Sequence, residues 1–212
     1  MTAGEQLAPA APVPAWLREL AAAAKTMEVP PLIAPPEQGG KPSAVLILFA
    51  DGPGGPDLLF IQRSQELRLH AGQPAFPGGS IDAGEGPVVA ALREAAEEVG
   101  VDPDGVDVVG MLPEVYIERT GFRVVPVLGW WRQPSAVAPV DAGEVAAVER
   151  VGVAELADPA VRLMVRVPDG RTTPAFRVRG MLIWGFTAGL VDRLLALAGW
   201  EKPWDQARVM DL

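Results

Sequence analysis

Apolar positions along the chain follow two periods, and these periods predict where strands and helices lie. Alternating or continuous apolar runs of four to ten residues predict strands. Such runs cover residues 43–50, 58–63, 106–112, 122–131, 144–151, 161–167 and 175–179. Helical spacing predicts helices at residues 14–25, 87–99, 153–157 and 184–198. This mixture indicates an α/β fold, and the turn-rich stretch 51–56 predicts a hairpin between the first two strands.

The first 42 residues have a different composition from the rest of the chain. They hold eight of the 22 prolines, and proline cannot donate to a strand ladder, so central sheet is excluded there. Within this arm, residues 14–25 place apolar side chains on one side of a short helix, namely Trp16, Leu17, Leu20, Ala23 and Ala24. We expect residues 1–42 to form an arm, its helix packing on the domain or on a second subunit, and residues 43–212 to form one domain.

Charge and composition exclude several classes of protein. A formal net charge of −9 argues against a nucleic-acid coat, because that function needs a basic surface. No apolar run approaches the roughly 18 residues of a membrane span, and the N-terminus, with Glu5, does not resemble a secretory leader. The absence of cysteine fits a cytoplasmic protein. An acidic chain that handles an anionic substrate needs local cations, either basic side chains or bound metal.

The helix predicted at residues 87–99 carries an unusual set of charges. Its apolar stripe predicts one core-facing side, formed by Val88, Leu92, Ala95, Ala96 and Val99. Glu94, Glu97 and Glu98 lie within about 100° of one another on the other side, in the turns where the helix dipole disfavours anions. A solvated acidic face is the alternative for an arbitrary helix. Clustered carboxylates are also the ligands that Mg²⁺ and Mn²⁺ prefer, and a cation would remove the repulsion.

The spacing of residues around this helix is specific. The chain has Gly79, then Glu85 after five residues, then after seven more the run from Arg93 to Val101, Arg-Glu-Ala-Ala-Glu-Glu-Val-Gly-Val. This pattern resembles the Nudix box, at residues 79–101. One departure is Ala95, where the box usually has a bulky aliphatic residue; this position belongs to the core stripe, so the change concerns packing. The resemblance implies a Nudix-type α/β/α sandwich, with a mixed β-sheet between helices, that hydrolyses phosphoanhydride bonds.

Several site roles follow from this resemblance. It implies a Mg²⁺ or Mn²⁺ site formed by Glu94, Glu97, Glu98 and the carbonyl of Gly78. Arg93 would orient a glutamate, either Glu85 or Glu97. Glu85 would act through such a contact, or simply as a favourable acid at the start of the helix. A carboxylate from a later loop often serves as base or further ligand, and Glu144 is the candidate, with Asp141 and Glu118 as alternatives; each could equally be a surface acid.

A second constellation directly precedes the box. It consists of Arg63-Ser64, then Arg68, Gly72 and the run Phe76-Pro77-Gly78-Gly79. This pattern is similar to the signature of the coenzyme A diphosphatase branch, whose members split coenzyme A into 3′,5′-ADP and 4′-phosphopantetheine. The branch usually has two leucines and a threonine before the arginine, whereas this chain has Leu-Phe-Ile-Gln at residues 59–62. The substrate expected from the resemblance is therefore coenzyme A or a related nucleotide.

The resemblance assigns the substrate contacts to Arg63, Ser64, Arg68, His70 and Phe76. Arginine forks suit phosphates, but pairing with nearby acids such as Glu66 explains them equally well from sequence alone. His70, the only histidine, is more often incidental in such a loop. Arg119 and Arg123 are further candidates, for which solvation of a strand edge is the alternative.

Other functions remain open at this point. The main alternative is a Nudix hydrolase of an oxidised nucleoside triphosphate, ADP-ribose or a dinucleotide. A Nudix module that binds a nucleotide without cleaving it usually has a degenerate glutamate helix, whereas here the acids are complete. Finally, the arm and tryptophans such as Trp130, Trp131 and Trp200 suggest a homodimer face, which can coexist with catalysis.

Overall fold

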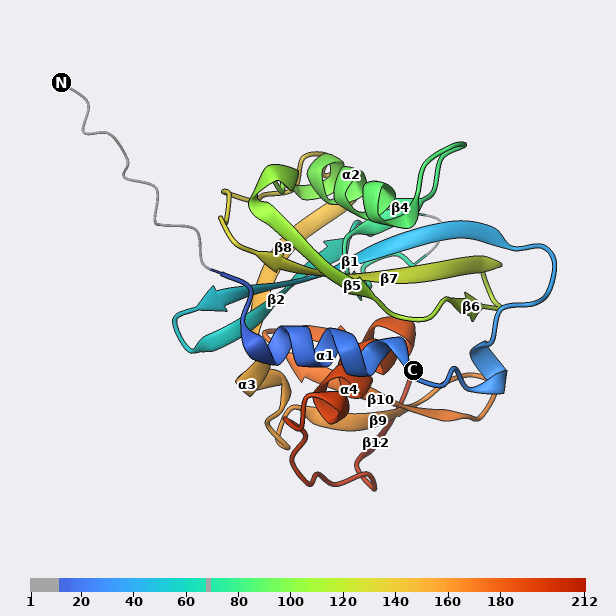
Figure 1. The fold of residues 1–212 in the computed structure, drawn as a ribbon. Coiled ribbons are helices and arrows are strands. Elements are labelled where there is room, and N and C mark those ends of the chain that lie inside the picture. Colours follow the sequence, from blue (N-terminus) through green and yellow to red (C-terminus); the bar gives the residue numbers. More distant parts are fainter. Residues whose placement is uncertain (1–11, 68–69) are drawn as a thin grey trace.

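The computed structural model describes residues 12–67 and 70–212 (Figure 1). Arg68, expected to contact substrate, lies outside the described residues, as do residues 1–11 of the expected arm. The helices are α1 (Ala15–Lys25), α2 (Pro87–Val99), α3 (Val153–Leu156) and α4 (Gly185–Leu197), with short 3₁₀ turns η1 (Pro31–Ile33) and η2 (Pro103–Gly105). All four predicted helices are thus present, with ends shifted by one residue at most.

The larger of two sheets has eight strands and mixed pairing. Its strands are β1 (Lys41–Gly52), β2 (Gly55–Arg63), β3 (Pro74–Ala75), β4 (Gly78–Ser80), β5 (Val106–Met111), β6 (Val115–Ile117), β7 (Phe122–Trp131) and β8 (Val145–Gly152). β1 and β7 are parallel, whereas the other pairs are antiparallel. The expected hairpin is observed, and its strands extend until only two residues separate them.

Each face of this sheet carries its own hydrophobic core, because alternate residues of a strand point to opposite faces. Leu46 and Leu48 of β1 pack toward α2, while Ile47 and Phe49 pack toward α1 and α4. Figure 1 shows α2 over one face and α1 with α4 over the other. The expected sandwich of helices around a mixed sheet is therefore confirmed.

A second sheet of four strands was not predicted as a separate unit. It contains β9 (Arg162–Arg166), β10 (Thr172–Val178), β11 (Met181–Ile183) and β12 (Val209–Asp211), in the order β11-β10-β9-β12. β11 lies against β3, directly before the glycines of the box. The second sheet therefore supports the segment that leads into the site.

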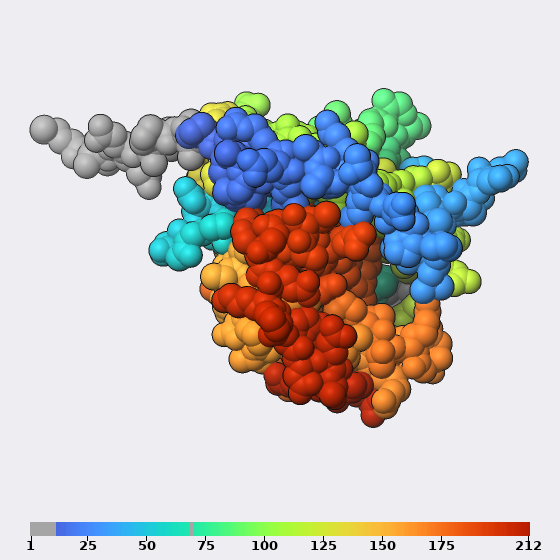
Figure 2. All heavy atoms as spheres, turned by 60° about the horizontal axis from the view of Figure 1, so that its bottom comes forward, coloured from blue at the N-terminus to red at the C-terminus, as the bar shows by residue number. Residues whose placement is uncertain are grey.

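Helix α1 packs into the domain core. Leu17 and Ala24 are fully buried, and the Trp16 ring lies 4.9 Å from that of Trp200. In Figure 2 the segments that contain α1, in blue, and α4, in red, lie side by side on this face of the molecule. Trp130 and Trp131 are only 1% and 2% exposed, so the expectation that they form a dimer face is wrong. Their positions on β7 point them alternately into the two cores instead.

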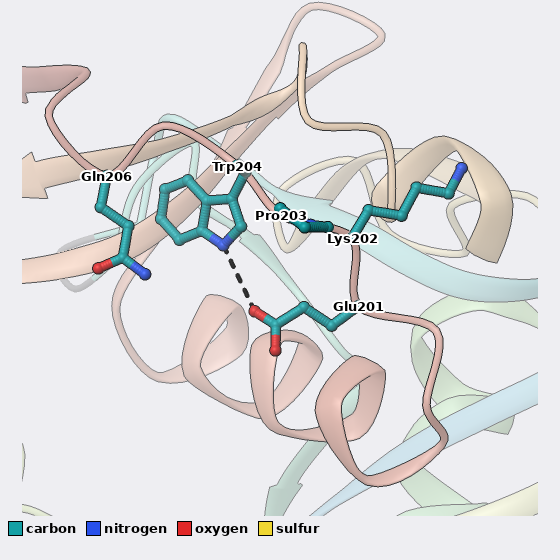
Figure 3. Close-up of a pocket in the computed structure, with 5 residues that line it drawn as sticks. All are labelled: Glu201, Lys202, Pro203, Trp204 and Gln206. Carbon is teal, nitrogen blue, oxygen red and sulfur yellow. Dashed lines mark hydrogen bonds between the residues drawn. The ribbon is translucent and has the colours of Figure 1, made fainter.

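Two surface hollows of about 400 Å³ each lie near the C-terminal segment. Figure 3 shows the first, lined by Glu201, Lys202, Pro203, Trp204 and Gln206. The second is more apolar and is lined in part by Val153 and Trp200. Neither is lined by the glutamates of α2. Among the described helices, none combines the length and apolar character that crossing a membrane requires.

Candidate active site

The glutamates are presented by α2, whose limits follow from its sequence. Pro87 occupies the first turn, where its missing N–H costs nothing, and Gly100 ends the helix in the left-handed conformation with φ 75°. Ala91, Ala95 and Val99 are fully buried against the sheet. The small side chain of Ala95, the departure from the usual box, therefore packs in the core, as its place in the apolar stripe predicted.

Glu98 is nearly buried although it is an acid, with 7% of its surface exposed. The backbone N–H of Gly78 donates to Glu98 Oε2 at 3.0 Å, and Arg63 Nη1 lies 3.8 Å from Glu98 Oε1. Burial raises the pKa of Glu98 from its usual 4.5 to about 7, because the hydrogen bond from Gly78 and the charge of Arg63 only partly offset the loss of hydration. In the folded protein this carboxyl therefore titrates near neutral pH.

Glu94 lies over Gly79 of β4. A Cβ atom at residue 79 would overlap the Glu94 carboxylate, so the missing side chain of Gly79 lets the carboxylate reach the strand. Burial raises the pKa of Glu94, and hydrogen bonding to Arg93 opposes this effect. The glycine pair therefore seats two acids: Gly78 binds Glu98 and Gly79 makes room for Glu94.

Arg93 connects the acids of the site. Its guanidinium donates to both oxygens of Glu85, at 3.0 and 3.1 Å. It also donates to Glu94 Oε1 at 3.0 Å, Glu97 Oε2 at 2.9 Å and the carbonyl oxygen of Ser80 at 3.0 Å. The sequence predicted a contact with Glu85 or Glu97, and both contacts are present. The Ser80 carbonyl was not predicted, because no sequence signal marks a backbone acceptor.

The residues present suit a divalent cation in their chemistry. Glu94, Glu97 and Glu98 supply oxygen donors of the hard kind that Mg²⁺ and Mn²⁺ prefer. Each of Glu94 and Glu98 has its pKa raised further by the other acids around it, Glu144 included, and a cation would relieve this repulsion.

The carboxylates of Glu94, Glu97 and Glu98 are not arranged as a complete set of metal ligands. Within residues 12–67 and 70–212, no three acidic or histidine side chains converge closely enough to hold a metal as they stand. Glu97, whose side chain is 60% exposed, points to Arg93 and would have to turn toward its neighbours. Metal binding by Glu94, Glu97, Glu98 and the Gly78 carbonyl therefore stays a prediction.

Glu144 directly precedes β8, beside an irregularity in the sheet. Between β2 and β8 the register shifts, so that Gln62 faces Ala147 whereas Arg63 faces Val145. Such bulges redirect side chains and are frequent beside active sites. The Ser64 N–H donates to the Glu144 carbonyl at 2.8 Å, which places Glu144 next to the signature segment.

The two alternatives to Glu144 have other surroundings. The Asp141 carboxylate accepts the N–H of Gly143 at 2.7 Å and so stabilises its own turn. Glu118 is exposed, and its charge acts on Arg171. The pKa of Arg171 is raised mainly by its hydrogen bond to Asp169 and to a smaller extent by the charge of Glu118. Of these three acids, only Glu144 raises the pKa values of Glu94 and Glu98.

The expected substrate contacts in the loop after β2 have structural partners. Ser64 is buried, and its hydroxyl accepts the N–H of Glu66 at 3.3 Å. His70, with φ 57°, places Nδ1 2.8 Å from the side-chain oxygen of Gln73. Phe76 is 3% exposed and stacks on Phe60 with ring centres 4.9 Å apart. These placements favour shaping of the loop over direct contact with substrate.

Arg123 is likewise engaged, since it donates twice to Glu114 Oε2, at 3.1 and 2.6 Å. Arg119 is exposed in the turn before β7. Among the described residues, neither arginine makes a contact that links it to the glutamates of α2.

Comparison with known proteins gives consistent results. A family model described as the NUDIX domain matches residues 40–176. "Uncharacterized Nudix hydrolase NudL" of Cronobacter sakazakii is 41% identical over 175 residues, covering 76% of this chain and 84% of that protein. The protein of the same name from Escherichia coli O1:K1 / APEC is 40% identical over 169 residues, with the same coverage. Among solved structures, the Nudix hydrolase RenU from M. smegmatis has a TM-score of 0.55 at 21% identity, covering 82% of this chain and 98% of that one.

Proposed function

This chain belongs to the Nudix hydrolase family, and we propose that it cleaves the phosphoanhydride bond of coenzyme A or its derivatives. The products would be 3′,5′-ADP and 4′-phosphopantetheine. Nudix hydrolases generally use divalent cations such as Mg²⁺ or Mn²⁺, and the oxygen donors on α2 suit either ion. The substrate proposal rests on the signature that begins at Arg63 and ends at Gly79.

One observation carries this proposal. The signature segment meets the same carboxylate at both of its ends: Arg63 lies 3.8 Å from Glu98, and Gly78 donates its N–H to Glu98. The segment that distinguishes the coenzyme A branch, from Arg63 to Gly79, therefore begins and ends beside a glutamate of the candidate site. A diphosphate held at the glutamates would lie beside residues of this segment.

The chain's own residues would divide the work as follows. Arg93 holds Glu85, Glu94 and Glu97 in a fixed arrangement, and the N–H of Gly78 fixes one oxygen of Glu98. When bound, a divalent cation neutralises diphosphate charge and lowers the pKa of a water ligand. We propose Arg68 near the substrate phosphates, where planar guanidinium donors bind well. Arg63 of the same signature faces Glu98.

We also propose Glu144 as the base or as a further ligand. The hydrogen bond from the Ser64 N–H to the Glu144 carbonyl supports this role. So does the charge of Glu144, which raises the pKa values of Glu94 and Glu98. Glu144→Gln should lower kcat by about a hundredfold to ten-thousandfold, the range of general-base catalysis. Asp141→Asn is the matched control, because its side chain accepts a hydrogen bond within its own turn and should leave kcat nearly unchanged.

A substrate panel tests the proposed function. The purified protein is incubated with Mg²⁺ or Mn²⁺ and coenzyme A, ADP-ribose, a dinucleotide or an oxidised nucleoside triphosphate, in ¹⁸O water, and products are weighed by mass spectrometry. We expect 3′,5′-ADP and 4′-phosphopantetheine from coenzyme A, with ¹⁸O in the product of the attacked phosphorus. Cleavage of the other compounds alone would contradict the substrate. Glu97→Gln and Glu98→Gln should abolish turnover, which separates catalysis from mere binding.

A further inference from the structure

Arg63 lies beside a glutamate of α2, Glu98. It is the last residue of β2, and its side chain lies on the same face of the sheet as those of Leu59 and Ile61, the face that carries α2. The Nε atom of Arg63 is buried and has no hydrogen-bond partner among the described residues. Only 29% of the side chain is exposed. Arg63 is therefore a partly enclosed side chain with a restricted range of orientations.

The enclosed guanidinium faces one oxygen of Glu98. Nη1 lies 3.8 Å from Oε1, while the other carboxylate oxygen accepts the N–H of Gly78. The two oxygens of Glu98 thus meet two different partners, one charged and one from the backbone. One oxygen accepts a hydrogen bond and the other faces a positive charge, so both contacts favour the same direction of the carboxylate before anything binds.

We propose that Arg63 is a positioning residue: with the N–H of Gly78 it fixes the direction of the Glu98 carboxylate. This inference rests in part on the proposed function, because it assigns one arginine of the substrate signature to the catalytic machinery. The signature segment then has two tasks. It lines the site, and it holds one of the glutamates of α2 from both ends.

The chain provides a closely matched control in Arg150. Arg150 lies on the neighbouring strand β8, its side chain is 32% exposed, and it pairs at 2.8 Å with Asp57, whose side chain is 10% exposed. Arg63 and Glu98 have corresponding exposures of 29% and 8%. Both pairs join a half-buried arginine to a nearly buried acid, but neither member of the Arg150–Asp57 pair contacts the glutamates of α2. Loss of a buried charge pair alone should therefore affect both variants alike.

Steady-state kinetics with coenzyme A separate positioning from substrate binding. A positioning role predicts that Arg63→Gln lowers kcat at least about tenfold with KM within about threefold, and that Arg63→Lys, which keeps the charge, recovers most of the rate. Arg150→Gln should leave both constants within about twofold. A large rise in KM with kcat retained would overturn the proposal, because Arg63 would then bind substrate. Equal losses of kcat in Arg63→Gln and Arg150→Gln would also overturn it.

A double-mutant cycle tests the pair without any substrate. At pH 8 and in the absence of metal, Arg63→Gln should lower the unfolding midpoint of the wild-type chain, because it leaves the Glu98 charge unopposed. In a Glu98→Gln background the same substitution should have little effect. Equal effects in both backgrounds would show that the residues do not interact, which contradicts the proposal. If the protein leaves coenzyme A intact, only the proposed function is contradicted. The double-mutant cycle then still tests whether Arg63 interacts with Glu98.

Discussion

The guanidinium of Arg93 donates two hydrogen bonds to the Glu85 carboxylate, at 3.0 and 3.1 Å, and so joins the loop before α2 to the helix itself. The pairing lowers the pKa of Glu85, mainly through the hydrogen bonds from Arg93, and keeps the acid charged. From this anchor the same guanidinium reaches Glu94 and Glu97. One arginine thus sets the relative positions of three acids.

Replacing Arg93 by lysine tests this arrangement. A lysine amine cannot bind the two oxygens of Glu85 as a fork and contact Glu94 at the same time, so kcat should fall by about tenfold to a hundredfold. Stability should change by less than about 1 kcal/mol, because the ion pairs are partly exposed. Enzyme assays with denaturant unfolding measure both quantities.

Arg132→Lys is the control for the Arg93 variant. Arg132 is similarly exposed, at 31% against 28%, and bonds one acid, Asp107, and one carbonyl, that of Asp104. Its substitution should leave kcat unchanged. Full activity in Arg93→Lys would show that the acids keep their positions without the fork.

Gly79→Ala is predicted to displace Glu94. A Cβ atom at residue 79 would overlap the Glu94 carboxylate, so the side chain must move away from β4 and kcat should fall at least about tenfold. Gly189→Ala in α4 is the control: residue 189 is exposed, a Cβ atom there would meet nothing within 4 Å, and the alanine should stabilise the helix by about 1 kcal/mol. Retained kcat in Gly79→Ala would mean that the position of Glu94 is not critical.

The sequence predicted the limits of α2 well because that information is local. Helical spacing, Pro87 and Gly100 define the helix, and the spacing from Gly79 to Val101 defines the box. The contact between Gly78 and Glu98 joins residues 20 positions apart and depends on how β4 pairs with β1. No periodicity within a segment contains that information.

The errors have the same origin. β11 and β12 have three residues each, too few for an alternating pattern to stand out, so only β9 and β10 of the second sheet were predicted. The expectation that Trp130 and Trp131 form a dimer face is wrong because the number of aromatic residues does not show which way their side chains point. Their neighbours on β7 are buried on both faces, and only the packing of α1 and α2 against the sheet shows why.

The metal-free protein should lose stability as pH rises through the range in which Glu98 titrates. Because the folded state raises the pKa of Glu98 from 4.5 to about 7, it favours the protonated form. The carboxyl therefore opposes folding least below pH 4.5, and its full effect, on the order of 3 kcal/mol, is reached above pH 7. Glu98→Gln removes this titration and should be more stable than the wild type at pH 8 in EDTA.

Unfolding at pH 5.5 and pH 8 measures the Glu98 effect. The difference between the two pH values should shrink in Glu98→Gln, whereas Glu97→Gln, at the 60% exposed position, should keep the wild-type difference. An unchanged pH dependence in Glu98→Gln would contradict the assignment. Excess Mg²⁺ should reduce the same difference, because a cation near the carboxylates favours their charged form.

Arg162 is predicted to hold the C-terminal segment, with no part in catalysis. Its side chain is fully buried between the rings of Phe176 and Trp204, and it pairs with Asp192 of α4 and with Glu201. Figure 3 shows Trp204 and Glu201 side by side, joined by a hydrogen bond of 3.4 Å. Arg162→Met would leave two acids without their partner, and Asp192, whose pKa is raised by burial, would be the more affected.

The expected loss of unfolding free energy for Arg162→Met is about 2 to 4 kcal/mol, toward the lower end because both acids remain partly hydrated. Arg166→Met on the same strand is the control: its pair with Asp211 is exposed, and its loss should cost less than about 0.5 kcal/mol. Because neither arginine approaches the glutamates of α2, kcat per folded molecule should be unchanged in both variants. A fall in kcat for Arg162→Met at a temperature where it is folded would instead couple the C-terminal segment to the site, through β11 and the strand that precedes Gly78.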